Sequence, residues 1–251
     1  MTTNPPKAPR VVERAGALII GAELLLGKVR DENLHPLAQM LQSLGIRLSR
    51  VAIVGDDEQT IASELQRLRQ SCDVVFTSGG VGPTHDDVSI AAVALALGRP
   101  VVQSLEFESL LRSVYGESIT PDHLLMARVP EGSELLSNRD ARWPTIVCDG
   151  VWMFPGVPEL FRMKLPVLRD HLRGPTPIFG EEVFSNAEEV NLKGIIDEVV
   201  AAHPRVEIGS YPKWFDERFK TRVTFDSTEE CAVRAAAEHF RRLLGDSLVI
   251  V

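Results

Sequence analysis

The chain has 251 residues, of which 44% are hydrophobic and 25% are charged, a composition typical of a folded globular protein long enough for two domains. Its net charge of −8 argues against non-specific nucleic-acid binding, which requires a basic surface. Three widely spaced cysteines match no disulfide framework or zinc motif, and no apolar run reaches the length of a membrane span. We therefore expect a cytoplasmic protein with neither nucleic acid nor membrane as a partner.

The first hundred residues alternate between short β-branched runs and amphipathic helical segments. Strands are predicted at 15–21, 46–54 and 73–76, and the helices that follow them at 33–45, 60–68 and 88–98. This alternation predicts a parallel sheet covered by helices on both faces, an α/β architecture.

A glycine-rich loop joins the third predicted strand to its helix, with the sequence T-S-G-G-V-G-P-T-H-D-D-V-S over residues 77–89. Gly79, Gly80 and Gly82 allow tight turning and let a ligand approach bare backbone. The free N–H groups and the positive dipole end of the following helix favour an anion. The sequence therefore predicts a phosphate-binding loop, and the alternative is a plain glycine-rich turn.

Acidic residues follow all three predicted strands: Glu23 after the first, Asp56 and Asp57 after the second, and Asp86 and Asp87 after the third. Ligands of open α/β sheets bind at the carboxyl ends of the strands. Because phosphate and carboxylate repel each other, their combination predicts a divalent metal between them. The alternatives are that Glu23 is a surface residue and that one aspartate of each pair is an N-cap.

Further glycine and cap positions extend this pattern. Asn33 precedes a helix whose Pro36 fits only the first turn, so it is either the N-cap or a ligand contact at the same helix end. A hairpin turned by Asp149-Gly150 is predicted, with strands at 146–148 and 151–154. Gly156 follows its second strand and again permits close approach to a ligand. Other expected elements are a short strand at 99–102, helices at 104–115 and from 120, and a helix from 158 to 168.

The last third of the chain reads as a separate, smaller domain. A linker is predicted at 172–177 from its glycine and prolines, followed by β-α-β-β-α-β, the ferredoxin-like α+β order. The loop at 211–216 carries Tyr211, Trp214 and Phe215 beside Lys213. These rings could stack a base or a flavin; the alternative is packing against the first domain or a partner subunit.

Four motifs occur in a fixed order: G-A-E-L-L-L-G at 21–27, V-G-D-D at 54–57, S-G-G-V-G-P-T-H-D-D-V at 78–88, and F-P-G-V-P at 154–158. With them the chain resembles the molybdopterin-binding, MoaB/Mog-like domain at the N-terminus of CinA, the competence/damage-inducible protein. It is more similar still to the corresponding domain of eukaryotic FAD synthase, a likeness that G-S-Y-P-K-W at 209–214 strengthens. The resemblance implies a three-layer α/β/α domain over 14–172 and a second domain over 178–251.

The resemblance also implies a chemistry. Relatives bind or adenylate molybdopterin, and the CinA-type and FAD-synthase-type domains are associated with metal-dependent cleavage of dinucleotide pyrophosphates such as ADP-ribose and FAD. The metal would be Mg²⁺ or Co²⁺, with K⁺ as a further cation, and the protein is expected to be a homo-oligomer. The implied catalytic residues are Asp56, Asp87 and Glu23, and the implied metal ligands are Asp56, Asp87 and Asp86. The implied phosphate-binding residues are Gly79, Gly80, Gly82, Pro83, Thr84, Asn33 and Gly156.

The chain departs from the family pattern at three places. Ala22 stands where relatives often have a polar residue, Val81 replaces the threonine of Mog proteins, and residues 138–149 lack the alanine-proline-glycine pattern of bacterial CinA. Neither the amidohydrolase domain of CinA nor the adenylyltransferase domain of FAD synthase is expected here. The leading hypothesis is therefore a metal-dependent hydrolase of dinucleotide pyrophosphates. The alternatives are a non-catalytic molybdopterin- or nucleotide-binding protein and a pterin adenylyltransferase.

Overall fold

A computed structural model describes residues 8–84, 86–137, 141, 143–214 and 218–250. The chain divides into two units, Met1–Pro175 and Thr176–Val251, and each is described by itself. No helix in the described part is long and apolar enough to cross a membrane. His85 and Phe215, which belong to the predicted loops, lie outside the described residues.

A six-stranded sheet of order β3-β2-β4-β9-β8-β7 forms the centre of the first unit. Its strands are β2 (Arg14–Ile20), β3 (Arg47–Val54), β4 (Val74–Ser78), β7 (Glu134–Leu136), β8 (Thr145–Cys148) and β9 (Val151–Phe154). The four strands β3, β2, β4 and β9 are parallel, and β8 and β7 complete the sheet in antiparallel fashion. All five residues of β4 are buried, as expected for a central parallel strand covered on both faces.

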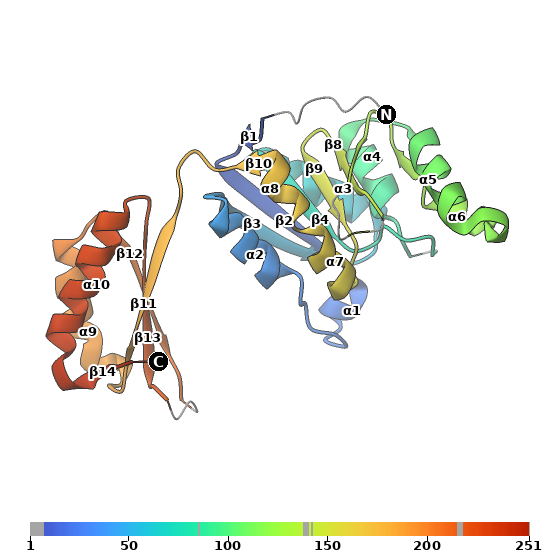
Figure 1. Ribbon diagram of the computed structural model, residues 1–251. Helices are drawn as coiled ribbons and strands as arrows, with labels where there is room; N and C mark the ends of the chain where they lie inside the picture. The colour runs from blue at the N-terminus through green and yellow to red at the C-terminus, as the bar shows by residue number, and fades with distance from the viewer. Residues whose placement is uncertain (1–7, 85, 138–140, 142, 215–217, 251) are drawn as a thin grey trace. The chain divides into compact units, whose positions relative to one another are not determined.

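Helices cover both faces of this sheet, which confirms the predicted α/β/α layering. Figure 1 shows α2 (Leu34–Ser43), α7 (Pro158–Lys164) and α8 (Val167–His171) on one side of it, and α3 (Glu58–Arg69) and α4 (Ser89–Leu97) on the other. Alternate residues of β2 serve the two faces, because successive side chains of a strand point in opposite directions. Ile19 packs in the core with α2 and α7, and Leu18 packs in the core with α3 and α4.

The remaining elements of the first unit are smaller. They are β1 (Arg10–Val11), α1 (Ala22–Leu25), β5 (Val101–Gln103), α5 (Leu105–Tyr115), α6 (Pro121–Leu125), β6 (Arg128–Pro130), β10 (Leu172–Arg173) and the 3-10 turn Gly116–Ser118. β5 pairs with β6 and β1 pairs with β10, outside the main sheet. The capping box of Thr120 and the cap of Ser104 begin α6 and α5 as their sequences predict.

Two predictions for this unit are wrong. The helix expected from 158 to 168 is two helices, α7 and α8, because Pro166 has no N–H to continue the first of them. Leu172–Arg173, expected in the linker, is strand β10 and pairs with β1. By contrast, Asp149 and Gly150 turn the β8–β9 hairpin with φ of 46° and 80°, as the Asp-Gly dipeptide predicts.

The second unit has a four-stranded antiparallel sheet of order β12-β13-β11-β14, with two helices on one face (Figure 1). Its elements are β11 (Phe179–Ser185), α9 (Glu189–Ala202), β12 (Glu207–Pro212), β13 (Thr221–Ser227), α10 (Glu230–Leu244), the 3-10 turn Gly245–Ser247 and β14 (Leu248–Val249). This order and connectivity are those of the split βαβ motif that the sequence predicts. Val183, Val223 and Phe225 point into the core between sheet and helices.

Candidate functional site

Three loops meet at the carboxyl edge of the parallel strands, and Asn33 ties them together. Its amide Nδ2 donates to Ser78 Oγ at 2.9 Å and to the Gly156 carbonyl at 2.7 Å. The residue is only 4% exposed, and its Oδ1 has no hydrogen-bond partner in the described part of the chain. Asn33 occupies the N-cap position of α2 but makes no side-chain cap bond there, and Asp31 Oδ1 accepts the N–H of Leu34, the first residue of the helix.

Gly79 brings the loop into close contact with neighbouring backbone rather than with open space. Its N–H donates to the Phe154 carbonyl at 3.1 Å, and its φ is 108°. A Cβ at this position would lie 2.2 Å from the Ile20 carbonyl oxygen. Gly156 packs on the other side, where a Cβ would lie 3.3 Å from Gly79 Cα. Gly79 and Gly156 therefore shape the site through packing between strand ends.

The helix after the loop begins without a side-chain cap. Its N-cap residue is Val88, so the alternative in which Asp86 or Asp87 caps this helix is wrong. The chain enters the helix through Gly80, whose φ is 64° and whose carbonyl accepts the Ser89 N–H at 2.9 Å. Ser89 Oγ donates back to the Gly79 carbonyl at 2.7 Å. The loop is thus held to the helix by its carbonyl groups, which leaves its N–H groups for other partners.

Several of these N–H groups have no acceptor within the described residues. They are the N–H groups of Gly80, Val81 and Gly82 in the loop, and of Ile90 and Ala91 in the first turn of α4. Unpaired N–H groups at the start of a helix carry the positive end of its dipole. Such an end is a ready site for a phosphate or carboxylate.

A cavity of about 130 Å³ opens over this helix end, and Gly82, Pro83, Thr84, Ile90 and Ala91 are among its lining residues. Arg128 of β6 also lines it, as a residue that the sequence reasoning missed. Within the described chain, Arg128 forms no ion pair. Pockets that enclose a drug-sized ligand measure roughly 300–1,000 Å³, so this cavity has room for a phosphate group but not for a whole dinucleotide.

Asp87 also lines this cavity, where it closes the loop on itself. Its Oδ2 accepts the Thr84 N–H at 2.8 Å and a hydrogen bond from the Thr84 hydroxyl. The Asp87 N–H in turn donates to the Thr84 carbonyl at 3.1 Å. These bonds leave Oδ1 of Asp87 as the carboxylate oxygen available to a ligand or a metal.

The acidic residues after β2 and β3 form a second group. Asp57 caps α3 and accepts the Thr60 N–H at 2.8 Å and the Thr60 hydroxyl at 2.6 Å, and these bonds hold the pKa of Asp57 below its usual value. Asp56 Oδ2 accepts the Ala22 N–H at 2.8 Å, which ties the end of β3 to the start of α1. Glu23 is exposed in the first turn of α1, next to that tie.

The predicted metal ligands are divided between these groups. Among the described residues, no cluster of three or more histidine, cysteine, aspartate or glutamate side chains could hold a metal ion, so Asp56, Asp86 and Asp87 do not form one. Asp56 and Asp87 each have one oxygen committed to backbone N–H groups and one left over. This donor set suits a Mg²⁺ ion that arrives with phosphate oxygens and water, rather than a closed protein cage.

The aromatic loop of the second unit is partly described. Trp214 is 85% exposed, and the ring of Tyr211 is covered by the guanidinium of Arg222, whose Cζ lies 4.9 Å from the ring centroid. Of these two rings, Trp214 is therefore the one open to stacking.

Comparison with known proteins follows the same division of the chain. Residues 16–172 match the family model described as probable molybdopterin binding domain, and residues 177–251 match the model for the middle domain of FAD synthase. The first match covers more than half of the chain. The chain belongs to the molybdopterin-binding domain family.

Three individual relatives each match more than half of this chain. A protein of Archaeoglobus fulgidus is 32% identical over 230 residues, covering 90% of this chain and 96% of that protein. A probable FAD synthase of Caenorhabditis elegans is 27% identical over 276 residues, covering 97% of this chain. The chain spans about half of that enzyme, 52% of its length. The solved structure of CinA from Thermoplasma acidophilum, a protein of unknown function, superposes with a TM-score of 0.58 at 26% identity, covering 62% of this chain and 96% of CinA.

Proposed function

We propose that this member of the molybdopterin-binding domain family binds the pyrophosphate of a dinucleotide, of the ADP-ribose or FAD type, and hydrolyses it with a divalent metal. The observation that carries the proposal is the uncapped start of α4, where unpaired loop N–H groups and Arg128 line one phosphate-sized cavity. The similarity of the second unit to the middle domain of FAD synthase supports a nucleotide as the ligand class.

In this proposal, the loop and Arg128 hold one phosphate, and the rest of the ligand extends over the exposed surface around the cavity. Gly82, Pro83 and Thr84 are exposed at its rim. The N–H groups and the guanidinium neutralise phosphate oxygens and stabilise the negative charge that grows on the leaving phosphate. Because the Ser89 and Gly79 contacts fix the loop, its N–H groups need little reorganisation during the reaction.

The free oxygens of Asp56 and Asp87 are the proposed protein ligands of the metal, with Asp86 and Glu23 nearby in sequence. When bound, Mg²⁺ or Co²⁺ would polarise the phosphate and lower the pKa of a bound water. The aspartates would orient the water for attack in line with the leaving phosphate and accept its proton. A monovalent cation such as K⁺ would serve only to neutralise charge, and homo-oligomer formation also stays a prediction.

A non-catalytic binding protein is the second candidate, and the divided carboxylates favour it. Binding needs the loop and Arg128, whereas hydrolysis also needs Asp56 and Asp87. Molybdopterin would then be the ligand, in line with the family description. A pterin adenylyltransferase would use the same loop, but it would transfer a nucleotide rather than release one to water.

The decisive experiment incubates the purified protein with ADP-ribose, FAD and NAD in the presence of Mg²⁺, Co²⁺ or EDTA, and separates the products. We expect water to cleave the pyrophosphate of at least one of them in a metal-dependent reaction, which releases AMP and a second phosphomonoester: ribose 5-phosphate from ADP-ribose, FMN from FAD or nicotinamide mononucleotide from NAD. Saturable binding of the dinucleotide without turnover under every metal would leave the binding protein as the function. Tight binding of molybdopterin without binding of any dinucleotide would overturn the proposal.

A further inference from the structure

A second polar cavity lies at the opposite edge of the main sheet, where β4 and β9 begin. It has a volume of about 400 Å³, within the range of small-molecule sites. Its lining comes from the end of α3, the turn into β4, the Asp149-Gly150 hairpin turn and Arg10 of β1. Because β4 has five residues, this cavity lies about 15 Å from the glycine-rich loop.

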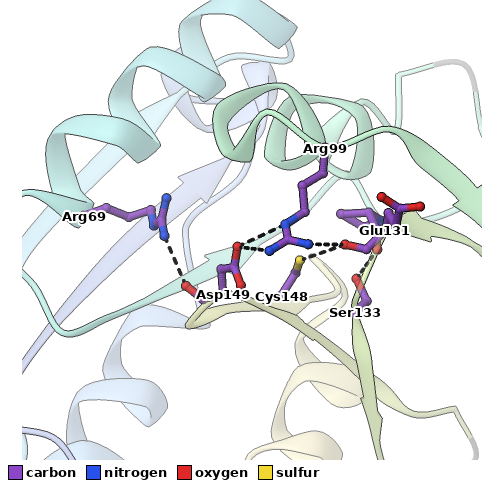
Figure 2. A network of polar contacts seen from close by, with 7 residues as sticks. Arg69, Arg99, Glu131, Ser133, Cys148 and Asp149 are labelled. Carbon is purple, nitrogen blue, oxygen red and sulfur yellow. Dashed lines mark hydrogen bonds and ion pairs between the residues drawn. The ribbon is translucent and has the colours of Figure 1, made fainter.

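Both carboxylates of this cavity are already occupied by internal donors. Asp73 Oδ2 accepts the N–H groups of Glu13 at 3.0 Å and Arg14 at 2.8 Å. The hydrogen bond from the Arg14 N–H, and to a smaller extent that from the Glu13 N–H, holds the pKa of Asp73 below its usual value. The carboxylate of Asp149 receives two hydrogen bonds from the guanidinium of Arg99, from Nε at 3.0 Å and from a terminal nitrogen at 2.7 Å (Figure 2).

Two further guanidinium groups line the cavity and contact only neutral acceptors. Arg69 donates to the Asp149 carbonyl at 3.3 Å, as Figure 2 shows, and Arg10 donates to the Asp73 carbonyl at 3.2 Å. Among the described residues, neither forms an ion pair. A guanidinium has five N–H donors, so each leaves most of its donors unused.

Both groups also converge on the same turn. Arg69 reaches Asp149 from α3, and Arg10 Nη1 lies 3.5 Å from the place that a Cβ of Gly150 would occupy. Among the lining residues, Arg10 and Arg69 balance the charges of Asp73 and Asp149, and Asp149 is also paired by Arg99 from outside the lining. What the cavity offers a ligand is therefore the unused N–H donors of Arg10 and Arg69, beside carboxylates that internal donors already occupy.

We propose that this cavity is a second anion site, which binds the phosphate group of a small phosphorylated ligand between Arg10 and Arg69. Guanidinium groups suit phosphate because they donate parallel hydrogen bonds to its oxygens. The amide of Gln70, which also lines the cavity, can donate to the same group or to the remainder of the ligand. The site is independent of the loop at 79–84 and of any reaction there.

Cys72 provides a reporter for this site, because it lines the cavity and is half-buried, whereas Cys148 is buried and Cys231 is exposed. In a Cys231→Ser background, the rate of Cys72 alkylation by iodoacetamide is measured against increasing inorganic phosphate, and against AMP. Sodium chloride at equal ionic strength is the control. We expect saturable protection by phosphate and AMP and none by chloride. Protection by AMP at lower concentration would identify an organic phosphomonoester as the ligand.

Substitutions of the two arginines test whether phosphate protects Cys72 by binding between them. Arg69→Gln and Arg10→Gln should each raise the concentration for half-protection at least about tenfold, the loss expected for a charge-assisted hydrogen bond. Two control variants make the same charge change elsewhere. Arg67→Gln changes an exposed residue of α3 that pairs with Glu64, and Arg128→Gln changes the cavity at the glycine-rich loop. Both should leave the protection of Cys72 unchanged. Equal protection by chloride, no protection, or unchanged protection in both Arg69→Gln and Arg10→Gln would overturn the proposal.

Discussion

Two loops of the first unit have the same sequence ingredients and use them differently. After β3, a glycine and two aspartates lead into α3, and Asp57 caps that helix through Thr60. After β4, glycines and two aspartates lead into α4, but Asp87 turns back to Thr84 and the N-cap residue is Val88. The first loop satisfies its own helix end, whereas the second leaves that end for a ligand. Capping, more than glycine content, separates the connecting loop from the candidate binding loop.

The largest expected difference between these loops is in their tolerance of a methyl group. Gly79→Ala should lower the free energy of unfolding by about 3 kcal/mol or more, because a Cβ would meet the Ile20 carbonyl at 2.2 Å and φ is 108°. Gly55→Ala is the matched control, since its Cβ would have no neighbour closer than 3.9 Å. Urea denaturation of both variants measures the difference. Equal stability of the two would show that Gly79 does not pack as described.

The parallel sheet, the ferredoxin-like order and the glycine-rich loop could all be predicted, because each depends on local periodicity or turn chemistry. The atoms that the loop glycines contact could not be predicted from the sequence. The sequence suggests that a Cβ at Gly80 blocks a ligand, but that Cβ would lie 2.4 Å from Ser89 Oγ with φ at 64°. We expect Gly80→Ala to lose both ligand binding and stability, so this variant does not test phosphate binding by itself.

Other parts of the site depend on tertiary pairing that one sequence does not reveal. Arg128 lines the cavity because β6 pairs with β5, a contact between residues more than twenty positions apart. Its only sequence signal is a lone arginine after a short helix. Likewise, Asn33 matches an N-cap pattern, and only the fold shows that its amide bonds to Ser78 and Gly156.

The loops are expected to share one feature, because each supplies one proposed metal ligand. Asp87→Asn and Asp56→Asn should each lower the rate of dinucleotide hydrolysis by about a hundredfold or more, because each removes a proposed metal ligand. An asparagine can still accept the N–H of Thr84 or Ala22, so the fold should remain stable. Asp57→Asn removes a charge one residue from Asp56 and should leave turnover unchanged. Wild-type turnover in both Asp87→Asn and Asp56→Asn would contradict the proposed metal ligands.

The cavity at the uncapped start of α4 predicts a smaller effect than the loss of a metal ligand, and this effect is on ligand affinity. Arg128→Gln should weaken the affinity for ADP-ribose by about 10- to 100-fold, the range for a lost charge-assisted hydrogen bond. Calorimetry measures this against Arg112→Gln, an exposed arginine that pairs with Glu108. Riboflavin, which has no phosphate, should bind far more weakly than ADP-ribose and show no dependence on Arg128. Equal binding of riboflavin would show that the loop does not hold phosphate.

The smallest expected effect belongs to the capped loop and concerns pH. Hydrogen bonds from the Thr60 side chain and then from its backbone lower the pKa of Asp57 below 3.8. Between the unfolded pKa of 3.8 and the lower folded pKa, Asp57 is protonated in the unfolded chain but ionised in the folded one. The stability that the Asp57 carboxylate contributes is therefore complete above the unfolded pKa and is lost as pH falls through the folded pKa. Asparagine is an equally good cap that does not titrate. The advantage of the wild type over Asp57→Asn should therefore be greatest near neutral pH and shrink as pH falls toward 3.

Asp57→Ala should melt about 2–4 °C lower than the wild type near neutral pH, because it leaves the Thr60 N–H uncapped. The same substitution at Asp87 should change the melting temperature less, since the Asp87 side chain closes an exposed loop and caps no helix. Circular dichroism melts of the three variants from pH 3 to pH 7 measure both effects. If Asp87→Ala lowered the melting temperature as much as Asp57→Ala, Asp87 would be as structural as the cap of α3, and the contrast between the two loops would fail.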